Sequence, residues 1–101
     1  MEITVTVDGS RVTYAPEGKL TVQTASELDK TVVSSFPEDA SDLEIDLANV
    51  DYVSSSGLRV FVSASKLAVL HGGSFSLLHP RDDVMDVLEV TGMADVFTVV
   101  R

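Results

Sequence analysis

The sequence predicts a single α/β domain built on a mixed sheet of four to five strands, with helices mainly on one face. The chain has 101 residues, which is the length of one domain with one hydrophobic core. Segments with an apolar residue at every second position alternate with segments whose apolar residues recur every three or four positions, which indicates strands joined through helices. Polar residues fill the remaining strand positions, so water is expected on one face of the sheet.

The N-terminal residues predict an antiparallel hairpin. Apolar side chains take every second position on both sides of the pair Asp8-Gly9: Ile3, Val5, Val7, Val12 and Tyr14. An Asp-Gly pair between two alternating runs is a strong hairpin signal, because the tight turn requires a positive φ that glycine adopts without strain. The first two strands are therefore expected to be neighbours.

A change of period then predicts an amphipathic helix that ends before Pro37. Thr24 and Glu27 have the spacing of a capping box, which indicates where this helix starts. The apolar positions follow at helical spacing: Ala25, Leu28, Val32 and Phe36. This stripe is expected to pack against the sheet.

The segment after this helix predicts a strand that is buried on one side only. Leu43, Ile45 and Leu47 alternate with Glu44 and Asp46. A parallel strand covered on both faces would be almost continuously apolar. The two carboxylates require water on the reverse side, so helices are expected on a single face here.

A second helix is predicted from Ser55 to about Leu70. Its proposed buried stripe consists of residues at helical spacing: Leu58, Phe61, Val62, Ser65, Ala68 and Val69. The run His71-Gly72-Gly73 provides a C-terminal stop, because glycine readily adopts the left-handed conformation that ends many helices.

The C-terminal third predicts one more strand and a third helix. Phe75 and Leu77 lie between serines, as in a half-exposed strand. The third helix opens at Pro80-Arg81-Asp82-Asp83, continues through Val84, Val87 and Leu88, and closes at Gly92. Residues 97–100 are compatible with a last strand and with a packed tail. Strands joined through helices are parallel neighbours, and the hairpin adds an antiparallel pair, so the sheet is expected to be mixed.

Composition excludes several classes of function. Sixteen acidic residues against seven basic ones give a formal net charge of −9, which disfavours binding to nucleic acid or to an anionic membrane. No apolar run approaches the roughly 20 residues that span a bilayer, and the start of the chain lacks the pattern of a signal peptide, so a cytoplasmic protein is expected. The chain has no cysteine, which excludes disulfides and thiolate chemistry.

One segment stands out as a candidate site, the run Ser54-Ser55-Ser56-Gly57 between a strand region and a helix. Sites collect beyond the carboxyl ends of parallel strands, because helix N-termini present free N–H groups there. Serine is among the best helix caps, so capping alone is one explanation, although it accounts for one serine and leaves two. Gly57 inside a helix costs up to about 1 kcal/mol relative to alanine, which suggests close approach by a partner or a phosphate.

Enzyme motifs do not fit this segment. A nucleophile elbow requires glycine two residues before the serine, where Val53 precedes Ser55, and His71 and His79 lie far along the chain. A phosphate-binding loop of the Gly-x-x-x-x-Gly-Lys type is absent, and no cluster of metal ligands is present. We therefore expect a non-enzymatic regulatory domain without catalytic residues, metal or cofactor.

At these residues the sequence resembles the STAS family, which includes the small single-domain anti-sigma factor antagonists. The run from Asp46 to Val50, followed by the run from Val53 to Leu58, resembles the most characteristic segment of the family. Supporting similarities lie in three further runs: Gly18-Lys19-Leu20 followed by Thr24-Ala25, Gly72-Gly73, and Val90-Thr91-Gly92-Met93. The resemblance covers nearly the whole chain and implies one STAS-like domain over residues 1–101.

The resemblance also implies a switch. In the family, the serine before the Ser/Thr-Gly pair is phosphorylated by an anti-sigma factor that is a serine kinase, and a metal-dependent serine phosphatase reverses the modification. The matching position is Ser55. The unphosphorylated domain binds the anti-sigma factor and frees the sigma factor, and the phosphorylated domain dissociates from the anti-sigma factor. The expected partner-binding residues are Thr21, Ser54, Ser55, Ser56, Gly57 and Arg59.

Two positions differ from the common pattern of the family, because Ser54 and Thr21 stand where acidic residues are often found. A second hypothesis is therefore a STAS scaffold that is never phosphorylated, such as a subunit of a lipid transporter or of a signalling assembly. A third is a domain that binds a small molecule or nucleotide through the same loop. The oligomeric state is expected to be a monomer or a weak dimer.

Overall fold

The computed structural model describes all residues 1–101 as an ordered series of strands and helices. The strands are β1 (Ile3–Asp8), β2 (Arg11–Pro16), β3 (Gly18–Leu20), β4 (Asp42–Asp46), β5 (Val50–Val53), β6 (Phe75–Leu78) and β7 (Thr98–Val100). The helices are α1 (Val22–Ser35), α2 (Ser55–Leu70), α3 (Asp82–Val90) and α4 (Met93–Val96). None of these helices combines the length and the apolar character that crossing a membrane requires.

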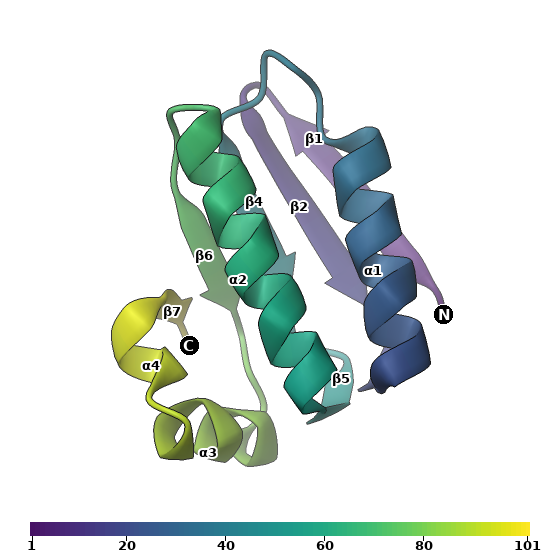
Figure 1. Cartoon of the computed structure of the whole chain (residues 1–101), viewed down its shortest axis with the longest axis vertical. Helices are drawn as coiled ribbons and strands as arrows, with labels where there is room; N and C mark the ends of the chain where they lie inside the picture. The colour runs from purple at the N-terminus through teal and green to yellow at the C-terminus, as the bar shows by residue number, and fades with distance from the viewer.

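The main sheet has five strands in the order β1-β2-β4-β6-β7, and β3 and β5 form a separate two-stranded sheet. β1 and β2 are antiparallel, whereas all other neighbours are parallel. Helices α1 and α2 lie side by side across one face of the main sheet (Figure 1). The predicted mixed sheet with helices mainly on one face is confirmed.

The hairpin forms as predicted, around a two-residue loop. Asp8 pairs with Arg11 across Gly9 and Ser10, and Gly9 has a φ of 62°. Because only the first of the two loop residues has a positive φ, the turn follows the type II′ pattern, in which glycine takes that position. The register places Val5 opposite Tyr14, which puts both side chains on the helix-covered face.

The two faces of the sheet differ as the alternating strands predicted. Val12, Leu43 and Leu77 are fully buried beneath the helices. Their neighbours Thr13 and Glu44 lie on the opposite face, where the Thr13 hydroxyl donates a hydrogen bond of 2.9 Å to the Glu44 carboxylate. This second face carries no helix, so its polar groups reach water without a desolvation cost.

The start of α1 differs from the predicted capping box. The helix begins at Val22, and Thr21 is its N-cap. The Thr24 backbone N–H donates to Thr21 Oγ1 at 3.3 Å, and the Thr21 N–H donates to Thr24 Oγ1 at 2.8 Å. The pairing of Thr24 with Glu27 was therefore wrong, because threonine occupies the third helical position in place of the usual glutamate or glutamine.

The buried face of α2 is also different from the predicted stripe. Leu58, Phe61 and Ala68 are buried as expected, whereas Val69 is 71% exposed. Val60 and Ala64 are buried although they were not in the predicted stripe. The reason is that α2 packs against α1 as well as against the sheet, which turns its apolar face toward the neighbouring helix.

The C-terminal segment settles the open alternative for residues 97–100. β7 pairs in parallel with β6 and forms the edge of the sheet. Gly92, with a φ of 79°, follows the end of α3 as predicted. The short helix α4 and the strand β3 were not predicted, because elements of three or four residues are too short to show a period.

Tyr14 gives the fold a pH dependence at high pH. Its side chain is fully buried, and its hydroxyl lies 3.0 Å from Ser35 Oγ. Burial raises the pKa of Tyr14 above 10.0, and the hydrogen bond with Ser35 lowers it by less. The unfolded chain therefore loses this proton first as the pH increases, so the folded state is favoured below pH 10 and loses stability above it.

Tyr14→Phe tests this account. At pH 8 the variant is expected to be about 1 kcal/mol less stable than the wild type, because one buried hydrogen bond is lost. Above pH 10 the difference in the free energy of unfolding should shrink, since phenylalanine does not ionise. Urea unfolding at several pH values measures this, and a constant difference up to pH 11.5 or so would contradict the assignment.

Candidate functional site

The candidate segment lies at the junction between β5 and α2. Ser54 is the N-cap of α2, and its Oγ accepts a hydrogen bond of 3.2 Å from the Gly57 N–H. The Ser54 N–H donates to the Leu20 carbonyl oxygen at 2.8 Å, which ties the junction to β3. The capping role therefore belongs to the first of the three serines.

Ser55 is the first residue of α2, and it is exposed to solvent. Because Ser54 provides the cap, the Ser55 hydroxyl is not needed for it. The predicted position at the start of the second helix is confirmed. A helix N-terminus carries a partial positive charge and free N–H groups, so a negative group on this hydroxyl would be favoured there.

Gly57 has a structural role that differs from the expected one. It is buried, and a Cβ built on it would lie 2.9 Å from Val53 Cγ1 and 3.2 Å from Leu20 Cβ. The close approach that requires glycine therefore comes from β3 and β5 of the same chain, so a partner or a phosphate is not needed to explain this residue. The absent side chain lets the first turn of α2 pack on the small sheet.

The small sheet also places the two helix starts next to each other. β3 and β5 pair in parallel, with Leu20 opposite Val53. The next residue in each chain segment is an N-cap, Thr21 for α1 and Ser54 for α2. The structure thus brings together two residues that are 33 positions apart in the sequence and that were both expected to contact a partner.

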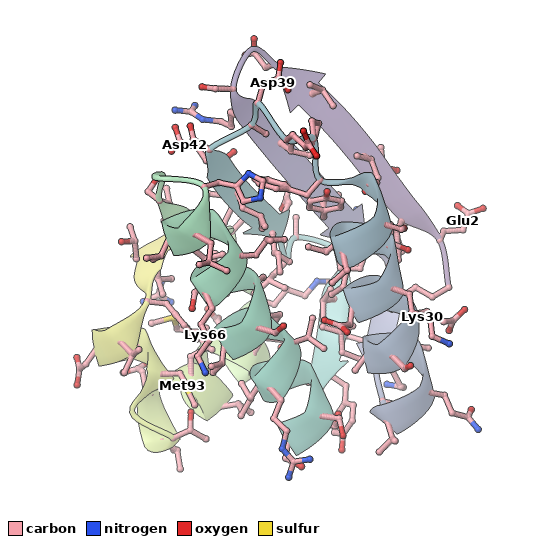
Figure 2. The ribbon with its side chains drawn as sticks, turned by 45° about the horizontal axis from the view of Figure 1, so that its top comes forward. Glu2, Lys30, Asp39, Asp42, Lys66 and Met93 are labelled. Atoms are coloured by element: carbon pink, nitrogen blue, oxygen red, sulfur yellow. The ribbon has the colours of Figure 1, made fainter.

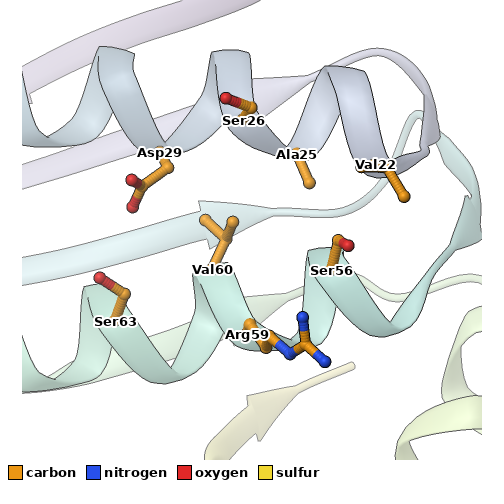
Figure 3. A pocket seen from close by; sticks show the side chains of 8 residues that line it. All are labelled: Val22, Ala25, Ser26, Asp29, Ser56, Arg59, Val60 and Ser63. Atoms are coloured by element: carbon orange, nitrogen blue, oxygen red, sulfur yellow. The ribbon is translucent and has the colours of Figure 1, made fainter.

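A groove of about 330 Å³ runs between α1 and α2 from this end of the molecule (Figure 3). Its lining residues come from both helices: Val22, Ala25, Ser26, Asp29, Ser56, Arg59, Val60 and Ser63. Ser56 and Arg59 were expected at a partner surface, and the structure places them on the α2 wall. The α1 wall was missed, because one sequence does not reveal which side of α1 adjoins α2.

Charged and aromatic side chains lie on β3 and β5, the small sheet that leads into both helices. Lys19 Nζ lies 3.5 Å from Asp51 Oδ2 and 6.0 Å from the centroid of the Tyr52 ring. Tyr52 is 49% exposed and Val22 is 69% exposed. Both side chains lie near the end of the molecule at which β3 and β5 lead into α1 and α2. No three acidic or histidine side chains gather where they could hold a metal ion.

Ser54→Ala tests the division of roles among the serines. Loss of the cap is expected to lower the free energy of unfolding by about 1 kcal/mol, and Ser54→Asp should retain most of the stability because aspartate caps equally well. Ser63→Ala, on an exposed position of the same helix, is the matched control and should cost nothing. Urea unfolding measures the free energy of unfolding of the three variants. A Ser54→Ala protein as stable as the wild type would contradict the capping assignment.

Comparison with known proteins places the chain in a family. The family described as "STAS domain" matches residues 2–101. The chain belongs to the STAS domain family. The anti-sigma-B factor antagonist of Bacillus subtilis strain 168 is 32% identical to it over 82 residues, which cover 81% of this chain and 74% of the relative.

Solved structures of other proteins share the fold. An anti-sigma factor antagonist from Mycobacterium paratuberculosis superposes with a TM-score of 0.85 at 18% identity, covering 98% of this chain and 84% of the other. The Bacillus cell fate determinant SpoIIAA in its phosphorylated form gives a TM-score of 0.74 at 14% identity, covering 99% and 92% of the two chains. At these identities the likeness concerns the fold, and the resemblance of the candidate segment rests on the sequence.

Proposed function

We propose that this STAS domain is an anti-sigma factor antagonist that is switched off by phosphorylation of Ser55. In its unphosphorylated form it binds an anti-sigma factor serine kinase and so releases a sigma factor. The observation that carries the proposal is the exposed Ser55 at the first residue of α2, beside a groove between two helices. Relatives named anti-sigma-B factor antagonists support the same function.

The docking surface of the proposal is the end of the molecule where α1 and α2 begin. It includes the free surfaces of Thr21, Ser55, Ser56 and Arg59, and we add Tyr52 and Val22. The chain carries a formal charge of −9, so a partner with a positive potential around its binding surface is favoured during encounter. Gly57 supports this surface from below, since it is buried.

The proposal includes two enzymes that act on this chain. The anti-sigma factor transfers phosphate to the Ser55 hydroxyl, and a metal-dependent serine phosphatase removes it. Both reach an exposed hydroxyl at a helix start without unfolding the chain. Ser54 and Thr21, which replace the acidic residues common in the family, are both N-caps here, and this keeps the two helix starts intact. The proposal places the chain in the cytoplasm, where sigma factors act.

Reconstitution tests the proposal. A complex of the anti-sigma factor with its sigma factor is mixed with increasing amounts of this chain, and free sigma factor is measured by size-exclusion chromatography. Release that saturates near one chain per anti-sigma factor is expected. An intact complex in the presence of a tenfold or so excess of folded chain would contradict the proposal, because the affinity for the anti-sigma factor would then be too weak to compete.

A second candidate is a STAS scaffold that is never phosphorylated, such as a subunit of a lipid transporter or a signalling assembly. The observation that favours it is the pair of uncharged residues, Ser54 and Thr21, at positions that are often acidic in phosphorylated members. The two candidates differ in what co-purifies with the chain from native cells. A kinase of the anti-sigma type supports the switch, and a membrane permease with an ATPase supports the scaffold.

A further inference from the structure

Arg59 is an arginine without an ionic partner in a strongly acidic chain. It takes part in none of the four ion pairs of the structure. The other arginines are all engaged: Arg11 with Glu44, Arg101 with Asp82, and Arg81 with the Ala48 carbonyl oxygen. Asp29 lines the same groove as Arg59, yet the two side chains form no ion pair. A guanidinium is thus available for an anion beside the first turn of α2.

Ser55 and Arg59 are four residues apart in α2, so they are neighbours on one side of the helix. Helical side chains lean toward the N-terminus, which brings a long side chain at 59 over the turn that contains 55. Figure 3 shows the Arg59 guanidinium extended back toward the turn of Ser56, with Asp29 near the other end of the groove. An anion four residues before a cation is also the favoured order for such a pair.

The position of Arg59 suits two different anions in turn. Phosphate on Ser55 would lie one helical turn away, and a guanidinium matches phosphate oxygens with two parallel N–H donors. A carboxylate from a docked protein would reach the same guanidinium from the groove, where Ser56 and Ser63 leave space. Both anions would use the same N–H donors, so only one can be bound at a time.

We propose that Arg59 reads the state of the switch: it binds a carboxylate of the docked anti-sigma factor when Ser55 is free, and it binds the phosphate when Ser55 is phosphorylated. This inference rests on the proposed function and adds its regulation. Phosphorylation then weakens docking in two ways, because it removes the guanidinium from the partner and places a negative charge beside the partner carboxylate. No rearrangement of the fold is required.

The first experiment does not depend on a kinase. Phosphoserine is incorporated at position 55 during translation, and the second ionisation of the phosphate is followed by ³¹P NMR in the wild type, Arg59→Gln and Lys66→Gln. Lys66 (labelled in Figure 2) is the matched control, since it is exposed, has no ion-pair partner and lies on the same helix, three turns beyond Ser55. The charged groups of the groove and of the small sheet, Asp29, Asp51 and Lys19, are the same in all three proteins.

The wild type and Lys66→Gln are expected to release the phosphate proton at a pH about half a unit lower than Arg59→Gln, a threefold difference in proton affinity. Equal values in the wild type and Arg59→Gln would overturn the phosphate contact. Circular dichroism checks that the exposed substitutions leave the fold unchanged. This result does not depend on the proposed function, because neither kinase nor partner is present.

The second experiment tests the partner carboxylate with the unphosphorylated chain. Arg59→Gln is expected to weaken binding of the anti-sigma factor about tenfold, which is the loss of one charged hydrogen bond, and Lys66→Gln should have less than a threefold or so effect. Unchanged affinity of Arg59→Gln, with wild-type binding intact, would overturn this half of the inference. Absence of binding by the wild type would instead contradict the proposed function.

Discussion

Ser55→Asp is expected to lower the affinity for the anti-sigma factor by more than about a hundredfold, whereas Ser55→Ala should keep it within about threefold. The reason is the exposed position of residue 55 at the start of α2, where an added charge faces the docked protein and leaves the core untouched. A carboxylate about 5 Å from a partner carboxylate costs on the order of 3 kcal/mol at an effective dielectric constant near 20. A phosphate adds roughly −1.5 to −2 charges and should have at least the same effect.

Isothermal titration calorimetry with the isolated anti-sigma factor measures these affinities. Lys66→Asp is the matched control, because residue 66 is exposed on the same helix three turns farther along and does not line the groove. Its added charge should reduce affinity by less than tenfold or so, since the charge interaction weakens with distance and with screening by salt. Similar affinities for Ser55→Asp and Ser55→Ala would show that local charge repulsion does not operate the switch.

Gly73→Ala is expected to destabilise the fold by about 3 kcal/mol, because it would overpack a site where two backbone segments meet. A Cβ built on Gly73 would overlap the carbonyl group of Ser41, which leads into β4. Its N–H also donates a hydrogen bond of 2.9 Å to the Ala68 carbonyl oxygen at the end of α2. The turn between α2 and β6 is therefore packed directly on the backbone of Ser41. Backbone atoms cannot move aside as the end of a flexible side chain can.

Gly72→Ala is the control for this substitution. Gly72 has a φ of 76°, and a Cβ there would meet nothing within 4 Å. Its replacement should cost only the strain of a left-handed conformation, about 1 to 2 kcal/mol. Urea unfolding compares the two variants. Equal losses would contradict the argument that close backbone approach, rather than backbone conformation, makes Gly73 necessary.

The order of the main elements could be predicted because their periods are clear. The alternation of Leu43 and Ile45 with Glu44 and Asp46 indicated a half-exposed strand, and β4 is one. Ser55 could be placed at a helix start because a strand region ends just before it and a helical period begins just after it. The sequence did not decide which serine caps the helix, since that depends on the backbone angles of Ser54.

What could not be predicted depends on contacts between distant segments. Gly57 is explained by Leu20 and Val53, which approach it only after β3 and β5 pair. The groove could not be predicted, because the sequence does not show which side of α1 faces α2. Val22, an apolar residue that is exposed at the first position of α1, is the one feature there that points to a surface role. Thr21 and Ser54 were both linked to the site by family resemblance, and the pairing of β3 with β5 gives the physical reason that they are neighbours.

Mapping the phosphate that the partner kinase transfers tests directly whether Ser55 is the switch. The chain is incubated with the anti-sigma factor and ATP, digested, and analysed by mass spectrometry, with Ser55→Ala treated in parallel. We expect one phosphate per chain, on Ser55, and none in the variant. Stoichiometric phosphate on another residue, with Ser55 unmodified, would contradict this assignment.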